Sequence, residues 1–280
     1  MNTPSSEKKK SKIIISTPSY RPWSGGVMVL HLLAKLLVES GWEVEFHKRG
    51  AKHLPFWNPY NIKLAKSCAP DDIMVYPQAV RKNQFKAKRI VRYVMGPTLF
   101  RNGFKLFIAE KWRQVAEDRG FDAPNNILFI IDSKHDFFVD QGRERSGSCY
   151  TLRKAKKLLE KRGFKKPEDM TEIHRGTRDK ELLEIFNTHE RFYCYDQHSF
   201  LSIQAALCGC DSIIVPMEGI SRKLAIESRP GCCTFGIAYG EEELPYARNT
   251  RHILKPWFEH YEKTQKILVK AMFEKIEEEI

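Results

Sequence analysis

A set of polar residues between Arg191 and Pro216 has the types and spacing needed to bind a phosphate-bearing ligand. Asp196 offers a carboxylate that accepts hydrogen bonds from hydroxyls, and Gln204, eight positions later, offers an amide that both donates and accepts. The hydroxyls of Ser199 and Ser202, which lie between them, can donate to phosphate oxygens. Whether these groups act together depends on the elements that hold them.

The segment that carries these residues is predicted to be a βαβ unit. Residues 192–195 are short and aromatic, which indicates a strand, and Ser199 is a suitable N-cap for a helix. Gly209 ends that helix, and the β-branched run 212–215 predicts a second strand. Such a unit places the carboxyl end of its first strand beside a helix N-terminus, an arrangement that suits a phosphate.

A second βαβ opening is predicted near the N-terminus. Residues 12–17 are β-branched, residues 27–39 carry apolar side chains at helical spacing, and residues 42–46 alternate as a strand does. Gly25 and Gly26 precede the helix, and because they lack a Cβ they let a ligand approach the free N–H groups of its first turn. A tight turn with packing glycines is the alternative. The motif Gly-x-Gly-x-x-Gly is absent from the sequence, which argues against a dehydrogenase.

These two stretches resemble the retaining glycosyltransferases of the GT-B fold, in particular the sucrose-synthase-like group 1 families. The family signature is a Glu, seven residues, a second Glu, and a helix of small residues ending in Cys-Gly. Here Asp196 and Gln204 stand at the two acidic positions, and residues 205–209 match the helix end. Both positions depart from the pattern, and Gln204 has lost the charge. The resemblance implies that Asp196 orients the donor sugar, that Gln204 contacts the nucleotide ribose, and that the donor site also includes Tyr195, Ser199 and Ser202.

A basic segment follows the strand predicted at residues 148–152. In the GT-B families a basic pair at this place binds the donor pyrophosphate, which the resemblance assigns to Arg153 with either Lys154 or Lys157. Gly25 and Gly26 are expected to contact the same diphosphate. A solvated basic helix face is the alternative. Because the chain has no Asp-x-Asp metal motif at a strand end, we expect these cations to replace a metal, with no cofactor beyond the nucleotide-sugar substrate.

The expected fold is α/β, with two Rossmann-like lobes facing across a cleft. Residues 1–132 would form the acceptor lobe, residues 133–147 a linker, and residues 148–280 the nucleotide-sugar lobe, with a final helix that begins at Pro256 and crosses back to the first lobe. Further strands are predicted at residues 72–76, 89–95, 106–109 and 126–131, and a helix at residues 179–186. His135 and Asp136, in the linker, are predicted to be surface residues.

The composition of this chain of 280 residues limits the compartment and the binding partners that we expect for it. Its 42% hydrophobic content suits a globular protein, its apolar runs are too short to span a bilayer, and its polar N-terminus is no secretory signal, so we expect a cytoplasmic protein. The seven cysteines lack zinc-site spacing and are expected to be small buried residues. The net charge of +12 suits a nucleoside diphosphate donor or an acceptor on an anionic membrane.

The function predicted from these features is sugar transfer from a nucleotide-sugar to a hydroxyl acceptor in glycan or glycoconjugate synthesis. The resemblance implies retention of anomeric configuration. The acceptor is expected to be a glycan, a glycoprotein or a lipid-linked molecule, with peripheral membrane contact and no nucleic acid. Two alternatives remain: a non-catalytic nucleotide-sugar-binding protein, favoured by the loss of charge at Gln204, and a nucleic-acid-binding protein, favoured by the charge of +12.

Overall fold

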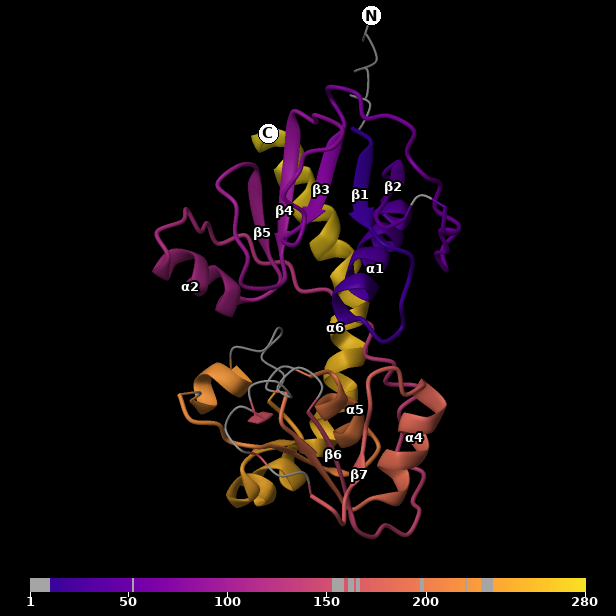
Figure 1. The fold of residues 1–280 in the computed structure, drawn as a ribbon, viewed down its shortest axis with the longest axis vertical. Coiled ribbons are helices and arrows are strands. Elements are labelled where there is room, and N and C mark those ends of the chain that lie inside the picture. Colours follow the sequence, from indigo (N-terminus) through magenta and orange to yellow (C-terminus); the bar gives the residue numbers. More distant parts are fainter. Residues whose placement is uncertain are drawn as a thin grey trace, which may run out of the picture. The chain divides into compact units, whose positions relative to one another are not determined.

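The computed structural model describes residues 11–51, 53–152, 159–160, 164, 167–196, 199–219, 221–227 and 234–280. The chain divides into two compact units. The first unit comprises Met1–Ile131 with Thr264–Ile280, and the second comprises Asp132–Lys263. Each unit contains one five-stranded parallel sheet (Figure 1).

The sheet of the first unit has the strand order β2-β1-β3-β4-β5. Its strands are β1 (Ile13–Thr17), β2 (Val44–Lys48), β3 (Ile73–Pro77), β4 (Arg89–Val94) and β5 (Phe104–Phe107). Helix α1 (Gly25–Glu39) connects β1 to β2, and helix α2 (Glu110–Asp118) follows β5. Alternation along β1 divides the core between the two faces of the sheet, because Ile13 and Ile15 pack with α1 whereas Ile14 packs with Met74 and Tyr76.

The sheet of the second unit has the order β10-β9-β8-β6-β7. Its strands are β6 (Ser148–Thr151), β7 (Thr171–Glu172), β8 (Arg191–Cys194), β9 (Asp211–Ile214) and β10 (Ile237–Tyr239). The described helical segments of this unit include α4 (Asp179–Thr188), α5 (Leu201–Leu207), the π-helical turn Lys223–Glu227 and the 3-10 turn Glu241–Glu243. Four of the cysteines, Cys149, Cys194, Cys208 and Cys210, are fully buried in the core, as predicted, whereas Cys68, which was also predicted to be buried, is partly exposed.

The last helix, α6 (Leu244–Glu279), contributes to the cores of both units. In the second unit Leu254 and Phe258 are fully buried on it, and in the first unit Phe273 packs edge-on against Trp42 with ring centroids 6.4 Å apart. Arg89 binds the chain end, because its Nε donates to the carbonyl oxygen of Ile280 at 2.9 Å.

Two predictions about individual elements are wrong. Residues 126–131 are not a strand: Ile127 forms only an isolated bridge with Phe107, and the apolar character of this segment reflects burial instead of pairing. The final helix does not begin at Pro256, which lies inside α6. Proline removes one helical hydrogen bond, but Pro256 is exposed while Leu254 and Phe258 on either side are buried, so packing maintains the helix through it.

The remaining predicted strands and helices occur within a few residues of their expected bounds. Among the helices that the structure describes, none has the length and apolar character that crossing a membrane requires.

Candidate functional site

The two sheets share one topology, and it locates the candidate site. Renumbered along each unit, both orders read 2-1-3-4-5, which places the reversal of strand order between β1 and β3 in the first unit and between β6 and β8 in the second. In open parallel sheets, ligands bind outside the carboxyl ends of the strands at such a reversal. The sequence-predicted donor residues Tyr195 and Asp196 directly follow β8, and Arg153 follows β6 after Leu152.

The turn between β8 and α5 is held by hydrogen bonds to Asp196. The backbone carbonyl oxygen of Asp196 accepts from the Ser199 N–H at 3.1 Å and from the Cys194 thiol at 3.1 Å. Asp196 is 3% exposed, so its carboxylate is withdrawn from bulk solvent. Ser199 is also buried, and its Oγ accepts from the Leu201 N–H at 3.3 Å. The N-cap of α5 is Phe200 instead of the predicted Ser199, which supports the first turn from one position earlier.

The other predicted donor contacts differ in how available their side chains are. Ser202 is fully buried, and its hydroxyl donates to the carbonyl oxygen of Ser199 at 2.9 Å, inside the turn. Gln204 is partly exposed in the middle of α5. Tyr195 lies in an aromatic cluster, with its ring centroid 4.9 Å from Phe164, and burial raises the pKa of its hydroxyl.

The predicted pyrophosphate cations Arg153, Lys154 and Lys157 lie outside the described residues. The backbone leading to them is defined, since the Tyr195 N–H donates to the carbonyl oxygen of Thr151 at 3.0 Å and thereby continues the pairing of β8 with β6. Thr151 and Tyr195 therefore lie side by side at the carboxyl edge of the sheet.

In the first unit, Gly25 and Gly26 are exposed in the first turn of α1. A Cβ on Gly26 would meet only the Met95 Cε, at 3.9 Å, so the surface beside this glycine is open. Ser24 is the N-cap and makes no side-chain capping bond. The arrangement leaves helix N–H groups available to an anion at the carboxyl edge of the first sheet.

A serine–histidine pair at the same edge was not predicted from the sequence. Ser16 and His47 are register partners on β1 and β2, and the Ser16 Oγ lies 3.0 Å from the His47 Nδ1. Burial, reinforced by the charge of Arg49, lowers the pKa of His47, so the imidazole is neutral at neutral pH and can accept a proton. The sequence feature that could have predicted this pair is the presence of polar residues at the carboxyl ends of two adjacent strands.

Arg92 is a second residue that the sequence analysis missed. It is 1% exposed on β4, between the rings of Tyr76 and Phe100 at 5.1 and 4.9 Å from its Cζ. Its Nη1 donates to the carbonyl oxygen of Val80 at 2.6 Å and its Nη2 to the Asn102 Oδ1 at 3.2 Å. One guanidinium thus holds the loops that follow β3 and β4. The sequence feature that could have predicted it is an arginine between the apolar residues Val91 and Tyr93 in the middle of a strand.

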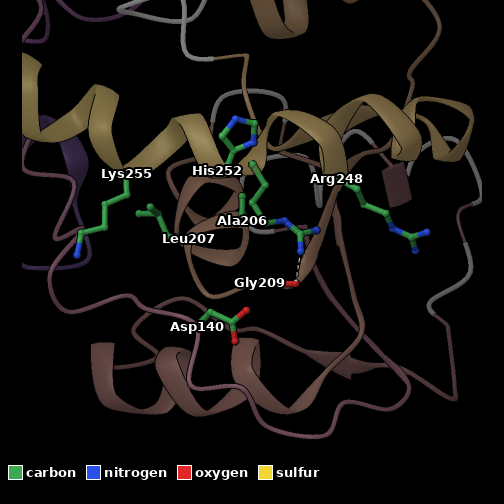
Figure 2. Close-up of a pocket in the computed structure, with 8 residues that line it drawn as sticks. Asp140, Ala206, Leu207, Gly209, Arg248, His252 and Lys255 are labelled. Carbon is green, nitrogen blue, oxygen red and sulfur yellow. Dashed lines mark hydrogen bonds between the residues drawn. The ribbon is translucent and has the colours of Figure 1, made fainter.

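A cavity of about 350 Å³ in the second unit lies away from the predicted donor residues. It adjoins Gly209 and the α6 residues Arg251 and Lys255. Figure 2 labels Gly209 and Lys255 among the residues that line it. Gly209 precedes β9, so the cavity is at the amino edge of the sheet, opposite to the edge that carries Asp196.

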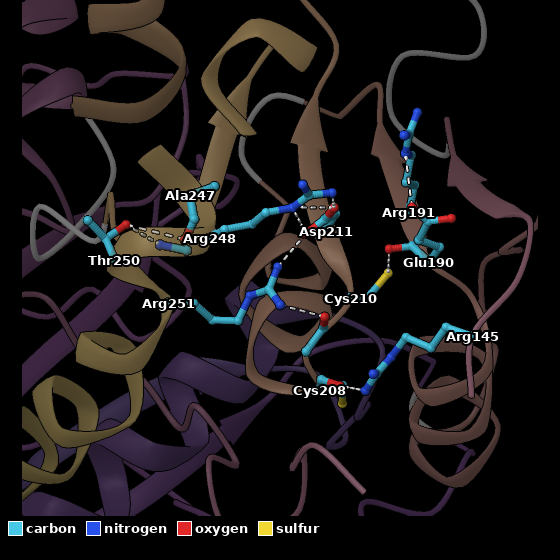
Figure 3. Close-up of polar contacts among 12 residues, drawn as sticks. Arg145, Glu190, Arg191, Cys208, Cys210, Asp211, Ala247, Arg248, Thr250 and Arg251 are labelled. Atoms are coloured by element: carbon cyan, nitrogen blue, oxygen red, sulfur yellow. Dashed lines mark hydrogen bonds and ion pairs between the residues drawn. The ribbon is translucent and has the colours of Figure 1, made fainter. Parts of the chain in front are cut away.

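The amino edge is held together by an ion network around Asp211 (Figure 3). The Asp211 side chain is 7% exposed, and its two oxygens each lie 2.5 Å from a guanidinium nitrogen, one of Arg248 and one of Arg251. Arg251 also donates to the carbonyl oxygen of Gly209 at 2.6 Å. The network connects α6 to the sheet. Because both arginines are already paired with a buried carboxylate, we assign the network a structural role.

Comparison with known proteins identifies the fold. No protein-family model matches the sequence, and no curated protein matches it. Three structures of T4 phage BGT, a β-glucosyltransferase, resemble this chain over 95% of its length and 99% of theirs. They are a point mutant with UDP-glucose (9% identity, TM-score 0.52), a complex with UDP and Mn²⁺ (8%, 0.51) and a complex with UDP-glucose (10%, 0.50). At such low identity the likeness concerns architecture, and it shows that the two parallel α/β units form the two-lobe Rossmann-like fold of the GT-B glycosyltransferases.

Proposed function

We propose that this chain is a glycosyltransferase that moves a sugar from a nucleoside diphosphate donor to a hydroxyl acceptor. The observation that carries the proposal is the polar turn after β8, with Asp196 and Ser199 at the strand-order reversal of the second sheet. This is where a parallel α/β sheet binds a phosphate-bearing ligand. A uridine nucleotide is the first donor to test, because the T4 phage BGT structures contain UDP or UDP-glucose.

The proposed roles follow the positions of the side chains. Asp196 orients the donor sugar, Gln204 bonds the ribose, and Ser199 and Tyr195 line the donor site. Ser202 was predicted to donate to phosphate, but because its hydroxyl hydrogen is directed to the carbonyl oxygen of Ser199 we assign it to support of the turn.

The proposed chemistry is electrostatic. Negative charge develops on the diphosphate as the sugar leaves, and preorganised cations and N–H donors stabilise that charge. Arg153 with Lys154 or Lys157 would supply the cations, and Gly25 and Gly26 would supply N–H groups. We propose that transfer needs no metal ion, so activity should survive EDTA; restoration by Mn²⁺ of activity lost to EDTA would contradict this.

The proposed acceptor is a hydroxyl of a glycan, a glycoprotein or a lipid-linked molecule, and a lipid-linked acceptor would bring the basic protein to an anionic membrane surface. From the resemblance to the group 1 families we further propose that the transferred sugar retains its anomeric configuration. The NMR coupling constant of the anomeric proton in the product tests this, since inversion would give the opposite anomer.

The experiment that tests the function is incubation with radiolabelled UDP-glucose and a panel of acceptors, with UDP release and label in the acceptor measured together. Acceptor-dependent release of UDP supports transfer, and Asp196→Asn should reduce it. Tight binding without release for every acceptor would instead identify a non-catalytic nucleotide-sugar-binding protein.

A second candidate is transfer to nucleic acid, which the net charge of +12 favours because the phosphate backbone attracts basic proteins. Internal DNA nucleotides carry no free hydroxyl, so a DNA acceptor needs a hydroxylated base. DNA containing 5-hydroxymethylpyrimidine should then become labelled, whereas unmodified DNA of the same sequence should not. Absence of label in both would remove this candidate.

A further inference from the structure

His135 belongs to a hydrogen-bonded group at the start of the second unit that the proposed function does not use. The Ser133 Oγ lies 2.5 Å from the Glu262 Oε1 and 2.9 Å from the His135 Nδ1. The N–H of Ser133 donates to the same Glu262 oxygen at 2.8 Å. Ser133 is 1% exposed and His135 is 9% exposed, so these bonds are shielded from water.

The hydrogen bonds in this group place a hydrogen on one ring nitrogen of His135. A carboxylate only accepts hydrogen bonds, so the single hydroxyl hydrogen of Ser133 is directed to Glu262. The Ser133 Oγ must then accept from the imidazole, which places the ring hydrogen on Nδ1. The other ring nitrogen, Nε2, is therefore the one that remains for a ligand.

This nitrogen faces carboxylates. The His135 Nε2 lies 3.6 Å from the Asp136 Oδ1, and one ligand atom from each of His135, Asp136 and Glu259 lies within 4.8 Å of the other two. Two neighbouring carboxylates repel one another, and a cation bound between them and the imidazole relieves that repulsion. Lys255 only partly meets this need, because its Nζ is 3.6 Å from the Asp136 Oδ1 and 3.9 Å from the Glu259 Oε1, both beyond hydrogen-bond distance.

We propose that His135, Asp136 and Glu259 bind a divalent metal ion of the zinc class. One imidazole and two carboxylates form a ligand set that zinc accepts, and the imidazole disfavours Mg²⁺ and Ca²⁺. Zinc bond lengths put neighbouring tetrahedral ligands about 3.3 Å apart. The pair of His135 and Asp136 is close to that spacing, and the half-exposed Glu259 side chain can complete it.

The surrounding residues fit this assignment. Metal-bound histidines usually donate their second N–H to an oxygen that holds the ring, which is the role of Ser133 and Glu262 here. The Asp136 side chain is 83% exposed, which gives an ion access and leaves a position for water. A metal ion would fasten residues 135 and 136 to α6 within the second unit, and this inference does not depend on the proposed function.

The test is calorimetric titration of the EDTA-treated, dialysed full chain with Zn²⁺. We expect one site that His135→Asn weakens at least tenfold, because asparagine can replace the Nδ1 donor to Ser133 but offers no Nε2 ligand. Lys255→Met should tighten binding about three- to tenfold, since it removes a competing positive charge. The matched control is Lys270→Met, which breaks a similar i,i+4 pair with Glu274 elsewhere on α6 and should leave the affinity unchanged.

Two results would overturn the proposal. One is equal zinc stoichiometry and affinity for the wild type and His135→Asn. The other is unchanged or weaker binding in Lys255→Met, which would identify the group as a salt-bridge cluster whose cation is the lysine. If His135→Asn does not fold, the comparison of Lys255→Met with Lys270→Met decides the question.

Discussion

Replacement of Asp211 by asparagine should destabilise the second unit, and the structure gives the size of the effect. The change keeps the shape of the side chain and removes the charge that Arg248 and Arg251 share. The Arg251 side chain is 25% exposed, so its charge-assisted bond is worth about 1.5–3 kcal/mol. The Arg248 side chain is 54% exposed, so water screens its contribution to about 1 kcal/mol or less. We therefore expect Asp211→Asn to cost about 1.5–4 kcal/mol.

The same network makes this loss depend on pH. Burial opposes the charged form of Asp211, but the hydrogen bonds and charges of Arg248 and Arg251 together outweigh it and lower the pKa. A carboxyl whose folded-state pKa is lowered stabilises the fold above its unfolded pKa of about 3.9 and loses this contribution as the pH falls through the folded value. The difference between wild type and Asp211→Asn should thus be full at pH 7 and shrink below about pH 4.

Urea unfolding of both proteins at pH 7 and at pH 3 measures this difference. Glu184→Gln is the matched control, because it breaks the Arg143–Glu184 pair, whose side chains are 43% and 58% exposed. That variant should lose about 1 kcal/mol or less. Equal stability of wild type and Asp211→Asn at pH 7, or a loss that stays the same at pH 3, would refute the reasoning.

Three further predictions concern the candidate site and one helix end. Arg153→Ala should lower turnover about 10²- to 10³-fold, the effect of removing one preorganised charge-stabilising group, and unchanged turnover in a steady-state assay would move this role to another residue. Gln204→Leu should weaken nucleotide binding by about 1–3 kcal/mol while Gln204→Glu preserves it, because leucine leaves ribose hydroxyls unpaired; equal calorimetric affinities of wild type and Gln204→Leu would exclude a ribose contact. Gly209→Ala should destabilise more than Gly41→Ala in urea unfolding: both glycines have φ +84°, but only at Gly209 would a Cβ collide with the Asp140 carboxylate, so equal losses would contradict the predicted collision.

Local sequence pattern predicted the elements whose residues decide their own conformation. Alternation and β-branching located β1, β3 and β4, and apolar spacing located α1. The strand predicted at residues 126–131 is wrong because the apolar character of this segment reflects its burial and not strand pairing. The helix start predicted at Pro256 is wrong because packing on both sides of this proline outweighs the loss of one helical hydrogen bond.

Features that depend on contacts between residues far apart in the chain could not be predicted from local sequence pattern. The network that joins Gly209, Asp211, Arg248 and Arg251 forms only after α6 packs against the second sheet. The hydrogen bonds that orient His135 likewise connect it, through Ser133, to Glu262, far along the chain. By contrast, the turn after β8 was predicted because the strand and the polar residues of that turn are adjacent in sequence.

The most direct test of the central claim is calorimetric titration of the full chain with UDP-glucose. If the turn after β8 binds the donor, the wild type should bind one molecule, and Asp196→Asn should weaken binding at least about tenfold, because it removes a charged acceptor for the sugar hydroxyls. Asp140→Asn, which alters an acidic residue at the opposite edge of the same unit, should leave the affinity unchanged. Absence of binding to the folded wild type, or equal affinity in wild type and Asp196→Asn, would contradict the account.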